Sequence, residues 1–429
     1  MRKKRSPLTP KTRSVLCCIL LFPLSLGAEG FRNSAPGAYA LGQSGGRNAF
    51  IDDASAALHN PANLVDLATG DGIDALISPT LVHIKSEFKV DGGGRARTKD
   101  PLKVLPNLFI TAPGPNERLA FGLSLTVPYG LATGWEKSGP FGPGGELRYL
   151  APFESEMLTL QINPVVAYRV NEQLSVAFGL SALYSELSFK QFFPQVMAPL
   201  PLVANETVAE ADMDGWGIGA NFAVSWDVTE RDRLALTLRS KTSIKHKGDS
   251  RIGALTPQAE AFGFTGRGSA ETRVTYPWII GLAYGRKLSD ALLLEVQYER
   301  VGFSDFEELN IDLGNNNPLF GGANVTRQDW KDSHTFGLGL RYDHGDGLRT
   351  HASLQYFKSP VPDDTLSTTI PDGDQIALTL GITKRWDRAY AGLAYSYVDY
   401  ESRRAEIGGV TGKIGTQLHL FAINAGWRF

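Results

Sequence analysis

Residues 216–226 read WGIGANFAVSW, and this stretch decides the fold. Every second side chain in it is apolar, a tryptophan stands at each end, and the residues between are small or polar. A period of two is typical of a β-strand with one apolar face. Aromatic residues at the ends of a segment of about ten residues favour a strand that crosses an outer membrane, because aromatic rings prefer the two membrane interfaces.

The same pattern recurs along the chain, at 119–127, 174–184, 276–284, 336–342 and 376–382. A soluble β-sandwich also alternates, but its apolar face would meet a second sheet, and nothing in it requires aromatic ends. We therefore predict an all-β transmembrane barrel of 14 antiparallel strands, an even number, as bacterial barrels have. The expected strands are 73–90, 103–112, 118–128, 156–170, 173–190, 214–228, 232–247, 269–287, 290–305, 330–344, 348–358, 374–385, 389–403 and 415–429.

The last expected strand ends the chain on an aromatic residue. Its apolar face consists of Phe421, Ile423, Ala425, Trp427 and Phe429. Outer-membrane proteins present such an ending to the barrel assembly machinery, which is therefore an expected partner. An edge strand of a soluble sheet is the alternative, but an exposed apolar edge is an aggregation hazard that barrel closure removes.

The first 28 residues are expected to be a secretory signal peptide. A basic segment precedes the apolar run Val15–Leu26, and the small residues Gly27 and Ala28 follow it. A lipoprotein signal is the alternative, since Cys17 and Cys18 lie in this run, but small residues do not precede them. The remaining chain has no cysteine, which excludes disulfides and thiolate metal sites.

Residues 45–64, GGRNAFIDDASAALHNPANL, are predicted to form one short helix. Asp52 and Asp53 cap its start, and Asn60-Pro61 ends it, because proline disfavours helix at the residue before it. Such a helix is too short to be stable alone, so we expect it to plug the barrel lumen. The expected organisation is a signal peptide at 1–28, a small helical N-terminal hatch at 29–72 and the transmembrane barrel at 73–429.

Two of the long links, which we expect to face the exterior near 129–155 and 191–213, are unusually apolar. Their apolar residues are Phe141, Tyr149, Leu150 and Phe153 in the first link and Phe192, Phe193, Val196, Met197 and Leu200 in the second. An apolar surface that faces water favours a groove for an apolar ligand. The alternative is that the loops pack on each other and cap the barrel.

Pro128, Tyr129 and Gly130 follow the third expected strand. Proline lacks the N–H that a strand ladder needs, and glycine tolerates a bulge. The wall therefore has a local gap here if pairing continues beyond Pro128; otherwise the strand ends there. Four basic residues could pair with an anionic head group near the lumen or be solvated at the rim: Lys190, Arg239, Lys331 and Arg341.

Signatures of catalysis are missing from the sequence. It has no phosphate-binding loop, no Gly-x-Ser-x-Gly elbow and no paired-histidine zinc motif. We expect no catalytic residue, no metal and no cofactor, although a lipid-hydrolysing barrel could assemble a Ser/His pair from different strands. The formal net charge is −2, so no overall charge favours nucleic acid.

Five short motifs, in their order along the chain, resemble the FadL-type outer-membrane transporters of long-chain fatty acids and other hydrophobic compounds. They are Glu29-Gly30-Phe31, Asp52-Asp53-Ala54, Asn60-Pro61-Ala62, Tyr129-Gly130-Leu131-Ala132-Thr133, and Ser359-Pro360-Val361-Pro362 with Ile370-Pro371-Asp372. The resemblance covers essentially the whole chain after the signal peptide. It implies a fourteen-stranded barrel in the bacterial outer membrane, with a hatch that contains Asp52, Asp53, Asn60, Pro61 and Ala62.

The resemblance also implies where a ligand would bind. A low-affinity groove would lie between the two apolar loops, and a tighter inner pocket would be touched by the N-terminal peptide, which puts Phe31 at the ligand. Lys331 matches a residue that binds the ligand carboxylate in this family, and Lys190 lies near the second such position. A kink in the family's third strand favours the gap at Pro128-Tyr129-Gly130.

We expect passive uptake of hydrophobic substrates, most of all long-chain fatty acids. The ligand would be caught in the loop groove, bind in the inner pocket and leave sideways into outer-membrane lipid when the hatch moves. Burial of alkyl surface, about 0.8 kcal/mol per CH₂, would drive it. Uptake of aromatic hydrocarbons by the same route, lipid hydrolysis and a general polar porin are the alternatives. The chain is expected to act as a monomer.

Overall fold

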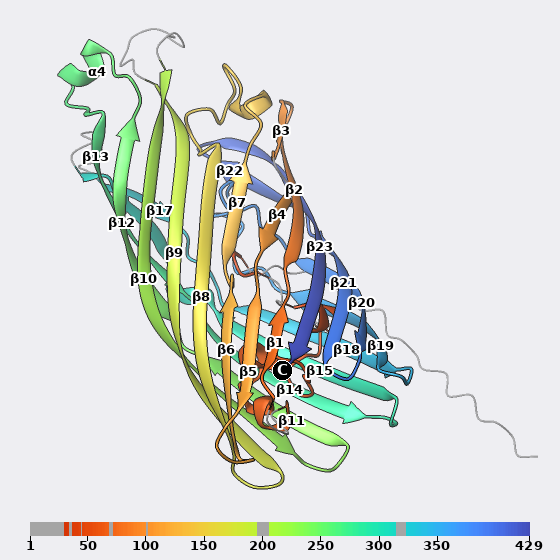
Figure 1. Ribbon diagram of the computed structural model, residues 1–429. Coiled ribbons are helices and arrows are strands. Elements are labelled where there is room, and N and C mark those ends of the chain that lie inside the picture. The colour runs from red at the N-terminus through yellow and green to blue at the C-terminus, as the bar shows by residue number, and fades with distance from the viewer. Residues whose placement is uncertain are drawn as a thin grey trace, which may run out of the picture.

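The computed structural model describes residues 30–33, 37–43, 45–67, 72–99, 102–194, 206–314 and 323–429. It is a closed antiparallel barrel with small helical elements in its lumen (Figure 1). The predicted signal peptide and the predicted groove residues Val196, Met197 and Leu200 lie outside the described residues.

Fourteen wall strands, several of them in two or three pieces, make up the barrel. Wall strands one to five are β1 (Asp74–Ile77) with β2 (Thr80–Val90); β3 (Arg95–Arg97), β4 (Leu102–Leu105) and β5 (Leu108–Pro113); β6 (Leu119–Thr126) with β7 (Gly130–Gly134); β8 (Glu154–Arg169); and β9 (Leu174–Pro194). Strands six to nine are β10 (Glu206–Asp227); β11 (Asp232–Arg239) with β12 (Thr242–Ile252); β13 (Arg267–Tyr276) with β14 (Trp278–Lys287); and β15 (Leu292–Gly302) with β16 (Glu308–Asp312). Strands ten to fourteen are β17 (Ala323–Arg327) with β18 (Ser333–Asp343); β19 (Leu348–Phe357); β20 (Gln375–Arg385); β21 (Ala389–Tyr400) with β22 (Arg403–Ile407); and β23 (Val410–Arg428).

The last strand closes the wall against the first. β23 pairs with β1 from Asp74↔Arg428 and with β2 up to Val90↔Gly412. Closure removes the edges of the sheet, including the apolar C-terminal edge. The predicted fourteen-stranded barrel is therefore confirmed.

Two predicted boundaries are wrong because the wall rises beyond the membrane. β9 and β10 pair continuously from Trp226↔Leu174 to Glu206↔Pro194, so Phe192 and Phe193 lie on a strand and not in a loop. The outward side chains become polar near Glu186 and Lys190, where the apolar alternation ends although the ladder continues. Of the two alternatives at Pro128, the structure shows the first: the third strand continues, since β7 resumes pairing with β8 at Gly130↔Leu158.

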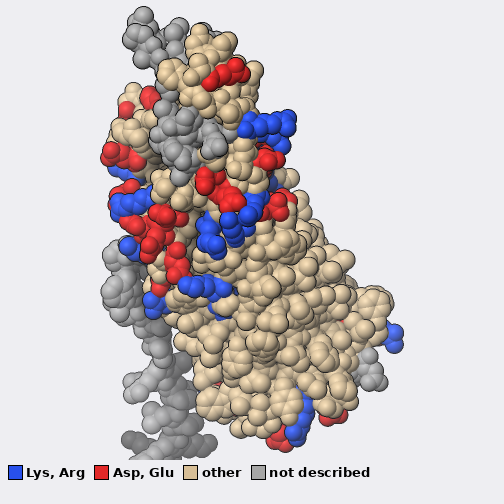
Figure 2. Space-filling model, turned by 90° about the vertical axis from the view of Figure 1, so that its left-hand side faces the viewer, with Lys and Arg blue, Asp and Glu red and all other residues tan. Residues whose placement is uncertain are grey.

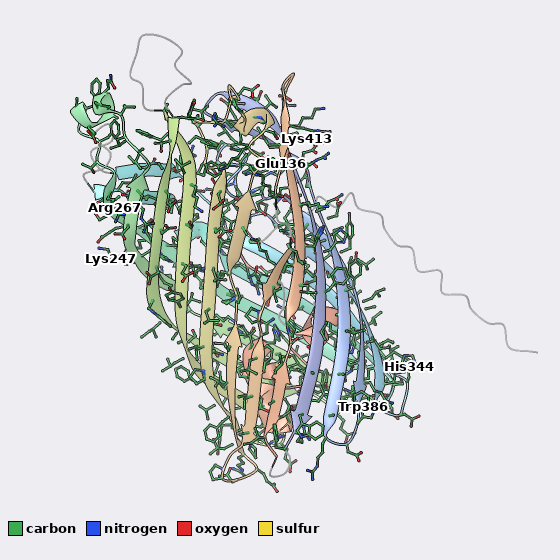
Figure 3. All side chains as sticks on the ribbon, turned by 45° about the horizontal axis from the view of Figure 1, so that its top comes forward. Glu136, Lys247, Arg267, His344, Trp386 and Lys413 are labelled. Carbon is green, nitrogen blue, oxygen red and sulfur yellow. The ribbon has the colours of Figure 1, made fainter. Side chains whose placement is uncertain are left out.

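The outer face carries the apolar side chains of the alternation. Trp216 and Ile218 on β10 are 59 % and 78 % exposed, while the alternating glycines Gly217 and Gly219 face Thr242 and Ser181 inside the wall. Charged side chains gather toward the long-loop end on the face in Figure 2, above a broad uncharged zone. The same end holds Glu136 and Lys413, and His344 and Trp386 lie at the opposite end (Figure 3). An apolar belt between two polar ends suits a bilayer.

The lumen is filled by the segment between residues 37 and 67. Its helices are α1 (Ala38–Gly42), α2 (Ala56–His59), η1 (Pro61–Asn63) and α3 (Leu64–Leu67). Short helices also lie in the loops: η2 (Gly139–Phe141), α4 (Pro257–Ala261) and η3 (Phe303–Asp305). None of the helices in the described part of the chain is long and apolar enough to cross a bilayer. Gly45 fits tightly against the wall, since a Cβ there would lie 2.4 Å from the Leu338 carbonyl oxygen.

The predicted single helix over residues 45–64 is wrong, because α2 and η1 divide it. Of the two predicted capping residues, Asp53 accepts a backbone amide at the start of α2, whereas Asp52 pairs with arginines of the wall. Helix α2 begins after Ser55, which makes no side-chain capping bond, and Asp53 instead accepts hydrogen bonds from the Ser55 amide and hydroxyl. Burial raises the pKa of Asp53 to about 6. The predicted end is correct: α2 stops at His59, and the Asn60 side chain then caps the turn that Pro61 begins. The Asn60 amide also donates to Ser225 Oγ on β10 at 2.8 Å, which ties the segment to the wall.

Asp52 anchors the opposite side of the lumen segment. Three wall arginines surround its carboxylate: Arg341 at 3.4 Å, Arg349 at 2.7 Å and Arg385 at 3.3 Å. Burial alone would raise the pKa of Asp52, but these guanidinium groups hold it well below its usual range. Two of the predicted head-group candidates, Arg239 and Arg341, thus hold the hatch, since Arg239 donates to the Leu58 carbonyl.

Candidate functional site

A buried aromatic cluster surrounds Phe31. The Phe31 ring is 1 % exposed and lies 5.3 to 5.9 Å, centroid to centroid, from five other rings. These are Tyr129, Tyr276, Phe303, Phe306 and Trp330. Four of the five contacts are edge to face, the geometry that aromatic quadrupoles favour. The cluster anchors the N-terminal peptide, residues 30–33, in the lumen.

The N-terminal peptide pairs with the interruption of the third wall strand. The Asn33 amide N–H donates to the Pro128 carbonyl and the Gly130 amide to the Phe31 carbonyl, each at 2.9 Å. The Asn33 side chain donates to the Val127 carbonyl, also at 2.9 Å. The backbone of residues 127–130 is therefore bonded to a peptide inside the barrel in place of a neighbouring strand.

Thr159 on β8 completes this arrangement from the wall. The Tyr129 amide donates to Thr159 Oγ1 at 3.0 Å, and that hydroxyl donates to the Tyr129 carbonyl at 2.7 Å. A buried backbone group without a partner is costly, so these bonds allow the strand to kink at Pro128. The residues predicted to border a gap, Pro128, Tyr129 and Gly130, all lie in this kink.

The kink leaves the wall unpaired between strands two and three. Below it β5 pairs with β6 up to Leu108↔Leu125, and above it a single bridge joins Thr98 to Trp135. Between these points, in the part of the chain that the structure describes, no ladder pair joins β4 to β7.

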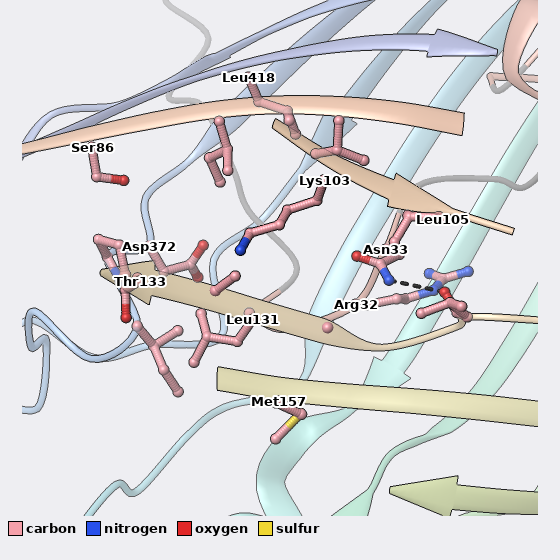
Figure 4. A pocket seen from close by; sticks show the side chains of 18 of the residues that line it. Arg32, Asn33, Ser86, Lys103, Leu105, Leu131, Thr133, Met157, Asp372 and Leu418 are labelled. Atoms are coloured by element: carbon pink, nitrogen blue, oxygen red, sulfur yellow. Dashed lines mark hydrogen bonds between the residues drawn. The ribbon is translucent and has the colours of Figure 1, made fainter. Parts of the chain in front are cut away.

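A cavity of about 310 Å³ occupies this position (Figure 4). Gly30, Arg32 and Asn33 of the N-terminal peptide form part of its wall, and Leu131 and Met157 are among its apolar residues. Its volume is at the lower end of the range for ligand pockets, about 300 to 1,000 Å³. The cavity thus touches the lumen, the N-terminal peptide and the unpaired part of the wall.

One buried carboxylate connects the N-terminal peptide to the luminal segment between residues 37 and 67. Glu299 on β15 accepts from Arg32 Nη2 at 2.9 Å and from Arg47 Nη2 at 3.2 Å. Glu295, two inward positions away on the same strand, accepts the backbone amides of Ala49 and Phe50 at 2.6 and 3.1 Å. The ninth wall strand is therefore a support for both luminal segments.

A second carboxylate, Asp372, holds the other end of the N-terminal peptide. It accepts the Ser359 hydroxyl at 2.8 Å and a backbone hydrogen bond from Gly30. Burial raises the pKa of Asp372 to about 7, although these hydrogen bonds and the nearby Arg403 oppose the shift.

The raised pKa of Asp372 predicts a pH dependence. Because the folded state binds the proton more tightly than the unfolded state, the segment 359–374 should become more stable as pH falls from about 7 toward the ordinary pKa of 3.8. We expect its amide hydrogen-exchange protection, corrected for intrinsic rates, to rise by roughly tenfold or more between pH 8 and pH 5.5.

Asp372→Asn should lose most of this rise. The change Asp374→Asn, at an ion-paired neighbour, is the matched control and should keep most of it. An equal rise in wild type and Asp372→Asn would contradict the prediction.

The first apolar loop packs on the ends of β9 and β10, which hold the described residues of the second predicted loop. Phe141, Phe153 and Phe192 are buried, and the last two rings lie 4.6 Å apart. Arg148 lies over Phe192 at 3.6 Å and pairs with Glu206 across the loops. Among the other residues predicted for a groove, Tyr149 hydrogen-bonds Glu206, Phe193 contacts Phe264, and Leu150 is exposed. The described residues of the two predicted links therefore have the packing expected of a cap over the barrel.

The predicted carboxylate-binding lysines do not line the cavity. Lys331 follows Trp330 of the aromatic cluster, has an exposed side chain and donates its amide to the Pro360 carbonyl. Lys190 pairs with Glu154 at 2.5 Å on the outer side of the wall. The cations that do line the cavity are Arg32, of the N-terminal peptide, and Lys103, on β4. Sequence reasoning missed Lys103 and Glu299, although charged residues at inward positions of an alternating strand would have indicated Glu295 and Glu299.

The comparison with known proteins is decisive for the family. The family model described as "Outer membrane protein transport protein (OMPP1/FadL/TodX)" matches residues 27–429. The chain belongs to this family. The FadL-family chain is thus an outer-membrane transport protein with a barrel fold. Membership of this family supports a transport function and not an enzymatic one.

The matches to known proteins cover nearly the whole FadL-family chain. It is similar to a long-chain fatty acid transport protein of Salmonella typhi, at 24 % identity over 97 % of this chain and 98 % of the relative. Its fold is similar to that of a Pseudomonas aeruginosa FadL homologue, with a TM-score of 0.82 at 21 % identity over 93 % of this chain and 99 % of the other. It is also similar to the Pseudomonas putida toluene transporter TodX, with a TM-score of 0.70 at 16 % identity over 92 % and 99 %.

Proposed function

We propose that this protein carries hydrophobic compounds, long-chain fatty acids above all, passively across the outer membrane and releases them sideways through the opening between wall strands two and three. The cavity between β4 and β7 is the observation that carries the proposal, because it joins the lumen to a stretch of wall in which the described residues form no ladder pairs. The names of the curated relatives, which are fatty acid transport proteins, favour this substrate class.

The proposed path begins at the exterior loops and ends in the bilayer. After removal of residues 1–28, the N-terminal peptide of the hatch would stand between the inner pocket and the opening. It contacts the aromatic cluster through Phe31 and the kink through Asn33, so a ligand that displaces one end disturbs the other. Transfer of an alkyl chain from water to an apolar site yields about 0.8 kcal/mol per CH₂, and no other energy source is required.

Aromatic hydrocarbons are the second candidate substrate. The cluster around Phe31 offers six aromatic rings, and the fold is similar to that of a toluene transporter. A neutral aromatic ligand would need no cation, whereas a fatty acid would use Lys331, which lies beside Trp330 of the cluster.

Phe31→Ala tests the inner pocket. The change removes the ring that anchors the N-terminal peptide, which forms part of the cavity wall, so oleate binding in nanodiscs should weaken by about tenfold, within the cost of a Phe→Ala truncation. Phe31→Leu keeps an apolar anchor and should stay near wild type. Lys331→Ala should weaken the binding of oleate and leave that of toluene unchanged. If Phe31→Ala and Lys331→Ala both leave oleate binding and cellular uptake unchanged, the pocket assignment is wrong.

A further inference from the structure

We infer that Lys103 is a second binding point for the carboxylate of an anionic single-chain amphiphile, at the point where the ligand passes from the barrel into the membrane. Lys103 lies on β4 and extends across the opening toward β7, which carries Leu131 and Thr133 (Figure 4). The site depends on the release route proposed above, and it names the chemical group that this route would recognise.

Charged residues that line the cavity differ in how firmly they are held. Arg32 is bound to Glu299 at 2.9 Å, and Asp372 accepts a hydroxyl at 2.8 Å. Lys103 has only a loose ion pair, with its Nζ 3.6 Å from Glu156 Oε1 on β8. That separation is too long for a hydrogen bond, and within the described residues no other side chain accepts one from Lys103.

The loose pair is easily exchanged. The side chains of Lys103 and Glu156 are 39 % and 52 % exposed, and ion pairs with that much access to solvent contribute little stability. A ligand carboxylate can therefore replace the Glu156 carboxylate on the ammonium group without leaving a buried charge behind. The same exchange is unfavourable at Arg32, because Glu299 is buried and also binds Arg47.

The surroundings orient the rest of the ligand. Leu102 and Val104, on either side of Lys103, are exposed on the outer face of the barrel, as is Leu158 on β8. Glu156 precedes Leu158 at the last polar outward position of β8 before the apolar belt begins. A head group on Lys103 thus lies at the border of the belt, with its alkyl chain able to follow the apolar residues into the bilayer. This is the orientation that a fatty acid adopts in a membrane leaflet.

Two substitutions distinguish a head-group site from an ion pair that only holds the opening closed. Lys103→Met removes the cation and should lower oleate uptake into liposomes or cells by about fivefold to tenfold. Glu156→Gln removes the competing carboxylate and should raise oleate uptake by about twofold. Oleyl alcohol has the same chain length without the charge, and its uptake should change by less than twofold in both variants. Retention of the compact barrel on unheated gels shows that each variant is folded.

The outcomes distinguish this site from the proposed function. If both substitutions change oleate uptake in the same direction, the Lys103–Glu156 ion pair only holds the opening closed, and the assignment of a head-group site to Lys103 is wrong. If oleyl alcohol changes together with oleate, or if neither variant changes oleate uptake, the site is also wrong. If the wild-type protein takes up neither oleate nor oleyl alcohol, the proposed function fails before the site is tested.

Discussion

Replacing Glu299 by Ala should detach the N-terminal peptide from the inside of the barrel. Glu299 is buried and binds both Arg32 and Arg47, so its loss leaves two neighbouring cations without their shared carboxylate. Removal of one partner from a buried ion pair costs about 3 to 5 kcal/mol. An effect of about 3 kcal/mol corresponds to roughly a 100-fold loss in the protection of the N-terminal peptide against protease, since about 1.4 kcal/mol is a factor of ten.

The wall itself should survive this substitution. Its strands are held by continuous ladders on both sides of β15, which do not involve the Glu299 side chain. We therefore expect a folded barrel whose N-terminal peptide is cleaved by protease about 100-fold faster and whose ion conductance in a planar bilayer is raised. Glu299→Gln should have a smaller effect, because the amide oxygen still accepts one hydrogen bond.

Glu271→Ala is the matched control for Glu299→Ala. Glu271 lies on β13 and pairs with two exposed lysines, Lys245 and Lys247, so its removal should change neither proteolysis nor conductance. Equal protease resistance of the N-terminal peptide in Glu299→Ala and in wild type would show that the aromatic cluster alone holds the peptide.

The sequence predicted the wall well, because the wall obeys a simple rule. Period-two alternation is local, and lipid on one side imposes it on every strand, as in Trp216–Trp226. The rule fails where lipid is absent. β9 and β10 extend past the belt, where the backbone ladder continues although the outward side chains are no longer apolar, and so the strand ends near Pro194 and Glu206 could not be predicted.

The luminal contacts were harder to predict because they join residues far apart in sequence. Pro128 indicated a possible break in the third strand, but the partner that satisfies the freed backbone is Asn33, which no local pattern connects to it. Asp52 looked like a helix cap because its neighbours are helix formers; three arginines from strands ten, eleven and twelve instead determine its place. Charged residues that face a lumen resemble rim charges until the register of the whole barrel is known.

Filling the cavity with bulky side chains should stop release without removing the ligand's other contacts. Leu131 and Met157 both line the 310 Å³ cavity, and tryptophan at either position takes up space in the opening between β4 and β7 that a passing alkyl chain would need. We expect Leu131→Trp and Met157→Trp each to lower oleate uptake by at least tenfold, as measured in cells that lack another fatty acid transporter.

The control for cavity filling lies on the same strand as Met157. Ile162 on β8 is exposed on the outer face and does not line the cavity, so Ile162→Trp adds the same ring to the lipid-facing surface and should leave uptake unchanged. Oleate should still bind to the purified Leu131→Trp and Met157→Trp proteins, because the Phe31 cluster is not altered. Wild-type uptake by both cavity variants would mean that the ligand leaves by another path, most directly through the lumen past the hatch. The opening between strands two and three would then be a structural consequence of the Pro128 kink and not a route for transport.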